Sequence, residues 1–284
     1  MSAFTSALKE KLIRKLMTAE EEVRVERALT HLNSTGYDDW GVSPDTLKAS
    51  LASSLWFYRH YYRVVTSGIE NVPAGRVLLV ANHSGQVPID GMFIATSLLL
   101  EGKPPRLARG MVERWAPALP FISTWFARCG QITGDIRNCR ELLERDECVM
   151  VFPEGVMGSG KTIFERYELQ KFGTGFMRLA LETKTPILPI AVIGLEESLP
   201  SLSKLAPLAK RFGIPYIPVI PTGFIPLPTK VSIRFGKPMT FEANSNVTDS
   251  EIEGLVDQVK FALRKELEEG LEKRGERIFT GSAL

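Results

Sequence analysis

The chain has 284 residues, of which 44% are hydrophobic and 24% are charged. This balance is typical of a globular protein and excludes a largely disordered one. Its 35 basic and 33 acidic residues leave a formal net charge of +2, which argues against a dedicated nucleic-acid-binding protein. A chain of this length buries a substantial core, so it needs neither disulfides nor a structural metal in order to fold.

The cysteines and the apolar stretches indicate the cellular setting. Cys129, Cys139 and Cys148 show no C-x-x-C spacing, which disfavours a disulfide framework or a zinc site and favours a reducing cytoplasm. The first helical stretch is basic but lacks the apolar run of a signal peptide. The longest apolar stretches, residues 91–100 and 115–127, are shorter than the roughly 20 residues of a membrane-spanning helix. We therefore expect a soluble or peripheral protein.

Residues 1–67 have the pattern of an N-terminal helical extension. Apolar residues repeat at helical spacing along its start: Phe4, Leu8, Leu12 and Leu16. With basic residues on the opposite face, this stripe predicts peripheral contact with an anionic membrane surface, although packing on the protein's own domain produces the same stripe. A second helix is predicted to begin at Ser43 as N-cap with Pro44 as its first residue.

Residues 68–284 have the pattern of an α/β domain. Apolar stretches 76–81, 148–152 and 186–194 are predicted strands, and stretches of helical pattern separate them. Residues 230–236 alternate in character and form a fourth predicted strand. Continuously apolar strands separated by helices predict a mainly parallel sheet that helices cover on both faces. An amphipathic C-terminal helix is predicted to start near Asp249.

Residues 155–162 match G-x-x-x-x-G-K-[ST], the pattern of a phosphate-binding P-loop, and follow a predicted strand. A P-loop enzyme also needs a second strand that ends in Asp to hold magnesium, whereas the strand at 186–194 leads into Leu195 and Glu196. A P-loop usually opens its domain, but here another strand lies some 70 residues upstream. An ATP-dependent phosphotransferase that uses residues 155–162 is therefore the alternative interpretation.

A histidine and two acidic residues follow the predicted strands. His83 comes directly after the first apolar strand, and Glu154 comes after a later one. The C-terminal edge of parallel strands is where open α/β sheets bind ligands, so we expect both residues at that edge. Asp90 lies downstream, where a carboxylate can hold the imidazole tautomer of His83. On a regular helix seven residues span about 10 Å, so the approach of Asp90 requires a looped path.

Four blocks occur together in this order: "NHSGQVPID" (82–90), "GQITGDIRN" (130–138), "FPEG" (152–155) and "PILPIAVIG" (186–194). The combination resembles the glycerolphosphate and lysophosphatidic-acid acyltransferase family over roughly residues 68–240. It is most similar to a bacterial subgroup with an NHSG-x-x-P-x-D block and a glycine-rich segment after FPEG. The family places its aspartate five residues after the histidine, whereas this sequence places it at seven.

The resemblance implies an O-acyltransferase of phospholipid or glycerolipid synthesis or remodelling. Such an enzyme moves a fatty acyl group from acyl-CoA or an acyl carrier protein to a hydroxyl of a lysophospholipid or of glycerol phosphate. It implies that His83, held by Asp90, is the catalytic base, and that neither a metal nor another cofactor takes part. The glycine-rich segment 156–171 is then a mobile substrate loop.

The resemblance also implies a substrate-binding site. We assign six residues to it: Arg137, Glu154, Gly155, Lys161 and Arg166 for the acceptor, and Pro189 for the acyl pocket. The family pattern implies the first three and the proline. Lys161 and Arg166 are our additions, because ammonium and guanidinium groups suit a phosphate dianion, and solvated loop charges are the alternative for both.

The expected partners are an acyl thioester donor, a glycerolipid acceptor and a membrane surface, without nucleic acid. The expected location is the cytoplasm, at the inner face of the membrane. A non-catalytic lipid-binding protein of the same fold is a second alternative, and it would bind acyl chains without releasing a thiol.

Overall fold

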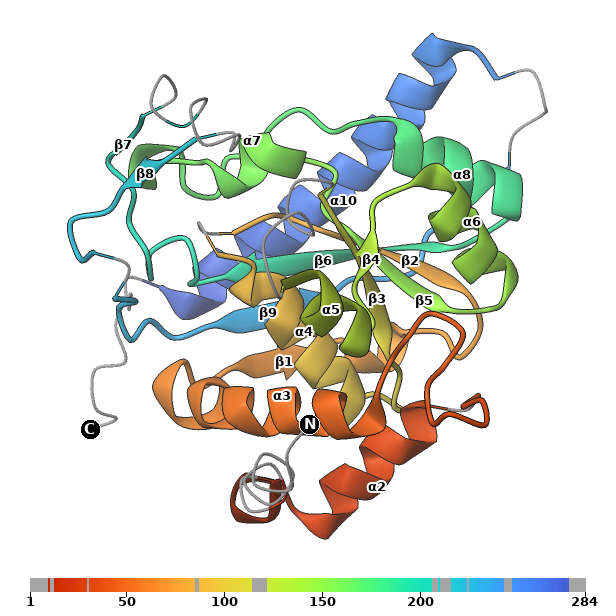
Figure 1. Cartoon of the computed structure of the whole chain (residues 1–284). Coiled ribbons are helices and arrows are strands. Elements are labelled where there is room, and N and C mark those ends of the chain that lie inside the picture. The colour runs from red at the N-terminus through yellow and green to blue at the C-terminus, as the bar shows by residue number, and fades with distance from the viewer. Residues whose placement is uncertain are drawn as a thin grey trace.

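The computed structural model of the chain describes residue 10 and residues 13–29, 31–84, 87–113, 122–205, 209, 216–223, 225–242 and 247–275. Within these ranges seven strands form one sheet with helices on both faces (Figure 1). Phe4, Leu8 and Leu12 of the predicted membrane-contacting stripe lie outside the described residues.

The central sheet has the strand order β1-β9-β6-β2-β5-β3-β4. Its strands are β1 (Val65–Ser67), β2 (Val77–Ala81), β3 (Ala108–Val112), β4 (Ile132–Thr133), β5 (Cys148–Val151), β6 (Ile187–Ile193) and β9 (Ser232–Phe235). Neighbours run parallel except β6 and β9, which pair antiparallel. The α/β class and the mainly parallel sheet are confirmed, with β1 and β9 reversed relative to the other described strands of this sheet.

Helices and short helical turns connect these strands. They are α2 (Ala19–Ala28), α3 (Pro44–Trp56), η1 (Phe57–Tyr61), η2 (Ile69–Asn71), α4 (Ile89–Leu100), α5 (Ile122–Arg128), α6 (Ile136–Glu144), α7 (Gly155–Ser159), η4 (Ile163–Glu165), α8 (Gly175–Thr183) and α10 (Asp249–Arg274). The predicted start of α3 is confirmed, because the Ser43 side chain accepts a hydrogen bond from the Thr46 N–H and Pro44 is the first helical residue.

The two faces of the sheet are covered by different helices. Leu78 and Val80 of β2 pack in a core with α6, α8 and α10. Val77 and Leu79 of the same strand pack in a second core with α4 and η1. Because successive side chains of a strand point to opposite faces, a strand that is covered on both sides must be apolar throughout, as β2 is.

The N-terminal helices pack on this domain. A third core cluster joins Val25 of α2 and Leu51 of α3 to Leu99 of α4. Leu16, the described member of the predicted stripe, is partly buried against the same cluster. Residues 65–67, at the end of the segment that we expected to be helical, instead form the edge strand β1 beside β9.

A small antiparallel ribbon of β7 (Ser203–Lys204) and β8 (Pro218–Val219) lies beside α7 in Figure 1. The Ile163 N–H donates to the Ser201 carbonyl at 2.8 Å and ties η4 to the start of this ribbon. Among the helices of the described ranges, none combines the length and the apolar character that a membrane span requires.

Candidate active site

The candidate site lies at the C-terminal edge of two neighbouring parallel strands. β2 ends at Ala81 and β5 ends at Val151, and their parallel register pairs Val80 with Val151. His83 follows β2 and Glu154 follows β5, so the same edge of the sheet carries both side chains. A second hydrogen-bonded link fixes the end of β2, because the Asn82 side chain exchanges two hydrogen bonds with the backbone of Val192 in β6.

His83 and Asp90 are in direct contact. His83 Nδ1 lies 2.6 Å from Asp90 Oδ2, and the Asp90 carboxylate is fully buried. The backbone N–H groups of Ser84 and Gly91 also donate to this carboxylate, each at 2.7 Å. Because α4 begins only at Ile89, the seven-residue separation is not spanned by two helical turns, and the looped approach is the observed one.

The surroundings of His83 favour its protonated form. Burial by itself lowers the pKa of His83, but the carboxylates of Asp90 and Glu154 outweigh burial and the opposing charge of Lys161, so the pKa is raised. The Phe152 ring stacks on the imidazole with the two centroids 4.5 Å apart. The His83 side chain keeps 17% of its surface exposed.

The carboxylate of Glu154 is directed at backbone groups. Its Oε1 accepts a hydrogen bond from the His83 N–H at 2.9 Å, and its Oε2 accepts one from the Gln170 N–H at 2.8 Å. Glu154 is buried. The glutamate of the FPEG block therefore fixes the backbone at the base, while its predicted contact with the acceptor stays a prediction.

Two glycines allow α7 to lie close to the base. Gly155 has φ +52°, a left-handed conformation that residues with a side chain rarely adopt. A Cβ at Gly158 would lie 2.5 Å from Glu154 Cβ and 2.9 Å from His83 Cβ. The role of Gly158 could not be predicted, because a glycine-rich stretch does not show which of its glycines contacts the site.

Lys161 is buried between carboxylates. Its Nζ donates to Glu196 Oε1 at 2.8 Å and lies 3.7 Å from Glu154 Oε2. Glu196 was not predicted as a site residue, because nothing in the residues next to it indicates its partner. The predicted role of Lys161 at the acceptor phosphate stays a prediction.

The P-loop interpretation gains no support from this geometry. The first five residues of the match form the short helix α7, and Lys161 is engaged by carboxylates. In a P-loop the lysine instead reaches the phosphates of the nucleotide. The segment expected to be a mobile loop contains α7 and η4, and the Lys161 contacts anchor it.

Three other predicted site residues are spread over the fold. Arg137 is exposed in the first turn of α6, which follows β4 at the C-terminal edge of the sheet. Arg166 is also exposed, and its guanidinium donates to the Ile163 carbonyl at 3.2 Å. Pro189 is buried in β6 opposite Val80 of β2. These placements leave the roles of the three residues as predictions.

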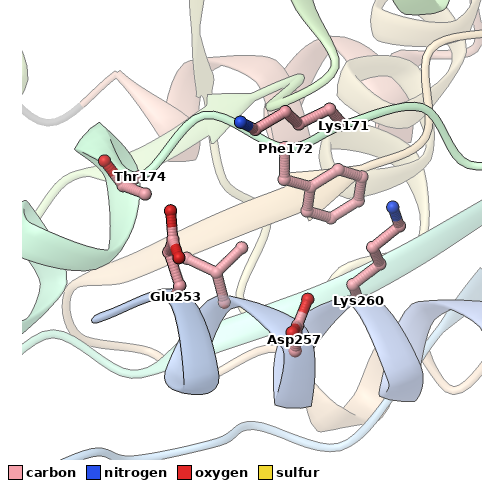
Figure 2. A pocket seen from close by; sticks show the side chains of 7 residues that line it. Lys171, Phe172, Thr174, Glu253, Asp257 and Lys260 are labelled. Atoms are coloured by element: carbon pink, nitrogen blue, oxygen red, sulfur yellow. The ribbon is translucent and has the colours of Figure 1, made fainter. Parts of the chain in front are cut away.

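A separate pocket of about 360 Å³ lies between the segment after Gln170 and helix α10 (Figure 2). Its lining residues are Lys171, Phe172, Thr174, Glu253, Val256, Asp257 and Lys260. The Lys260 Nζ lies 5.4 Å from the centroid of the Phe172 ring. On the α10 side the lining is of mixed charge, because Glu253 and Asp257 lie on the same helix as Lys260. Among the described residues, no group of three or more His, Cys, Asp or Glu side chains is arranged to hold a metal ion.

Comparison with known proteins relates this arrangement to a family. A family model described as acyltransferase matches residues 63–193, a range that contains His83, Asp90 and Glu154. An uncharacterized protein of Mycobacterium leprae is 36% identical over 243 residues, which cover 81% of this chain and 66% of that protein. A probable 1-acyl-sn-glycerol-3-phosphate acyltransferase of Mycoplasma pneumoniae is 26% identical over 149 residues, which cover 50% of this chain and 53% of that protein.

The fold is similar to that of a solved enzyme. The crystal structure of PlsC, the 1-acyl-sn-glycerophosphate acyltransferase of Thermotoga maritima, matches with a TM-score of 0.54. The match covers 97% of this chain and all of that one, at 16% sequence identity, and therefore shows a shared fold. The chain spans about two thirds of the length of the M. leprae relative.

Proposed function

The chain belongs to the acyltransferase family of the glycerolphosphate and lysophosphatidic-acid type, and we propose that it moves a fatty acyl group from an acyl thioester to a glycerolipid hydroxyl. The observation that carries the proposal is the contact of 2.6 Å between His83 Nδ1 and the buried Asp90 carboxylate. A histidine that is held in this way at the edge of a parallel sheet is arranged to act as a general base.

The proposed reaction uses no covalent enzyme intermediate. Because Asp90 engages Nδ1, the other ring nitrogen of His83, Nε2, takes the proton from the acceptor hydroxyl. The hydroxyl oxygen then attacks the thioester carbonyl, the carbon–sulfur bond breaks, and the departing thiolate takes up the proton from the imidazolium. The products are an ester and a free thiol. A positioned general base accelerates such a step by roughly 10²- to 10⁴-fold.

The charges around His83 suit the positive ring that this step creates. Asp90 and Glu154 raise the pKa of His83, and the same carboxylates stabilise the imidazolium while the oxygen attacks. Holding the acceptor and the thioester side by side supplies further acceleration, because it makes the encounter effectively intramolecular.

We propose a lysophospholipid or glycerol phosphate as the acceptor and a membrane surface as its source. The M. pneumoniae relative bears the name of a 1-acyl-sn-glycerol-3-phosphate acyltransferase, which supports an acceptor that carries phosphate. Arg137 is exposed and follows β4 at the same edge of the sheet, where a guanidinium can pair with a phosphate. Acyl-CoA and acyl carrier protein both present the required thioester.

Thiol release tests this function directly. Purified protein is supplied with acyl-CoA or an acylated carrier protein and with a panel that contains glycerol 3-phosphate, lysophosphatidic acid and other lysophospholipids. We expect thiol release that depends on the acceptor and matches ester formation by mass spectrometry. Donor binding without thiol release for any acceptor would instead indicate the lipid-binding alternative. Magnesium-dependent ATP hydrolysis that Lys161→Ala abolishes would indicate the phosphotransferase.

A further inference from the structure

Lys161, Glu154 and Glu196 form a buried charged cluster behind His83. Their residues are only 5%, 4% and 6% exposed, respectively. The Lys161 ammonium lies between the two carboxylates, 2.8 Å from Glu196 Oε1 and 3.7 Å from Glu154 Oε2. Within the described part of the chain, Lys161 is thus the cation that lies between these two buried carboxyl groups beside the proposed base.

The cluster holds the segment that follows α7. The second oxygen of Glu196, Oε2, accepts a hydrogen bond from the Tyr167 N–H at 2.7 Å. The Tyr167 hydroxyl accepts one from the Gly194 N–H at 2.9 Å and another from Arg274 at 3.2 Å. Arg274, in the last turn of α10, also pairs with Glu197 through two hydrogen bonds of 2.6 and 2.7 Å. Residues 194–196, which follow β6, therefore hold Tyr167 through both its backbone N–H and its side-chain hydroxyl.

The same segment returns to Glu154. Gln170, three residues after Tyr167, donates its N–H to Glu154 Oε2, and the other Glu154 oxygen accepts the His83 N–H. The chain of contacts therefore runs from Glu196 through Lys161 to Glu154, and from Glu154 to the backbone of His83.

Burying these three charged side chains costs free energy, so stability alone does not explain why they lie here. Three charged groups taken out of water give little net stability compared with apolar residues of similar volume. Removing only one partner, however, leaves an uncompensated buried charge. Lys161 also opposes the carboxylates that raise the pKa of His83, so it acts on the base electrostatically.

We propose that Lys161 and Glu196 are positioning residues whose ion pair holds the Glu154 carboxylate in the orientation that fixes the backbone of His83. In this arrangement Lys161 acts through Glu154 and does not contact the acceptor. The expected effect of Lys161 and Glu196 on kcat rests on the proposed acyl transfer. Their expected effect on the backbone of His83 does not depend on that function. The competing hypothesis is that Lys161 binds the acceptor phosphate.

Kinetics with two kinds of acceptor distinguish these hypotheses. We expect Lys161→Met to lower kcat at least about tenfold and to leave the acceptor KM within about twofold. The loss should be equal for lysophosphatidic acid and for monoacylglycerol, which lacks phosphate. Lys265→Met is the control, because this lysine is exposed on α10 and belongs to no predicted site, and it should leave kcat unchanged. A rise in KM confined to lysophosphatidic acid would overturn the proposal in favour of a phosphate ligand.

The double variant Lys161→Met/Glu196→Gln tests the coupling. Lys161→Met alone leaves two buried carboxylates without a cation, whereas the second substitution removes one of those charges at nearly constant shape. We therefore expect the double variant to recover at least about threefold in kcat over Lys161→Met. If the losses in kcat of the two single variants multiply in the double variant, with no recovery, Lys161 and Glu196 are not coupled and the proposal is contradicted.

Hydrogen exchange supplies a readout without turnover. The amides of His83, Tyr167 and Gln170 donate to the Glu154 and Glu196 carboxylates, and in Lys161→Met we expect each to exchange at least about tenfold faster. In Glu196→Gln we expect faster exchange of the Tyr167 amide. This variant replaces Lys161→Met in the test if Lys161→Met does not fold. Unchanged exchange at the three amides in folded variants would overturn the proposal. If the amides respond to the substitutions as expected but the wild-type protein releases no thiol, the proposed function is wrong and the positioning role of Lys161 and Glu196 still holds.

Discussion

The Glu154 carboxylate accepts a hydrogen bond of 2.9 Å from the backbone N–H of His83, which lies 71 residues earlier in the chain. The ring of His83 is held separately by Asp90, through a contact of 2.6 Å. One carboxylate therefore fixes the backbone of the proposed base, and another fixes its ring. The NHSG and FPEG blocks act together because β2 and β5 are parallel neighbours that end at the same edge of the sheet.

His83→Ala should lower acyl transfer at least about a hundredfold, because a glycerol hydroxyl is a weak nucleophile near neutral pH without a base. Binding of the acyl donor should remain, since the substitution removes the base alone. Thiol release and donor titration measure the two effects. His60→Ala is a suitable control, because His60 is exposed on η1. Near-normal turnover of folded His83→Ala protein would refute the proposed mechanism.

Asp90→Asn should lower kcat at least about tenfold, but less than His83→Ala does. The amide keeps an acceptor oxygen for only one of the Ser84 and Gly91 N–H groups, and it loses the negative charge that stabilises the imidazolium. We expect the pKa of His83 to fall in this variant, because the Asp90 carboxylate is the largest of the influences that raise it. Steady-state kinetics give the first effect, and proton NMR of the imidazole gives the second. An unchanged His83 pKa would mean that the carboxylate does not act on the ring.

The pH profile should reflect the raised pKa of His83. General-base catalysis requires the neutral ring, so the acid limb of kcat/KM should lie above the ordinary histidine value of about 6.5. Glu154→Gln removes one of the charges that raise this pKa, so the acid limb should move to lower pH. Lys161→Met removes the opposing charge, and the limb should move to higher pH. Shifts in the opposite directions would show that another group limits the rate.

Much of the fold was predictable because helices cover both faces of the sheet. β2, β5 and β6 are apolar at nearly every position, and this pattern by itself marks buried parallel strands. β3 was missed because it carries Arg109, a charged residue in a buried position. β1 was missed because it has only three residues and follows helical sequence without a break in polarity. In both cases the strand forms because it pairs with strands distant in the sequence, and the hydrophobic pattern of its own residues does not indicate this pairing.

The candidate site was predictable in part for a similar reason. His83 and Glu154 follow apolar strands, so their place at the edge of the sheet could be inferred from the sequence. Glu196 could not, because its burial depends on Lys161, which lies 35 residues earlier. The buried state of Lys161 was missed too, since a lysine in a glycine-rich stretch normally indicates an exposed loop.

Arg109→Met should destabilise the fold by about 3 kcal/mol or more. Arg109 is buried and lies 2.7 Å from Asp38 and 2.9 Å from Glu147, so its loss leaves two carboxylates without their cation. Because Asp38 belongs to the N-terminal segment, the same contact ties that segment to β3. Urea unfolding measures the change in free energy. Arg140→Met is the control, since its pair with Glu182 lies at the surface, and it should change stability little.

Gly158→Ala should impair both stability and activity, because the new methyl group has no room. It would lie 2.5 Å from Glu154 Cβ and 2.9 Å from His83 Cβ, and both of those atoms are fixed to backbone. α7 must therefore move away from the sheet, at a cost of about 1–3 kcal/mol, and the Glu154 contact with the His83 N–H must lengthen. Gly254→Ala is the matched control within helix α10, where an added Cβ meets no atom within 4 Å and alanine should stabilise the helix by about 0.5–1 kcal/mol. Thermal unfolding and kcat are measured for both variants. If Gly158→Ala kept wild-type kcat, the packing of α7 against His83 would have no part in positioning the base.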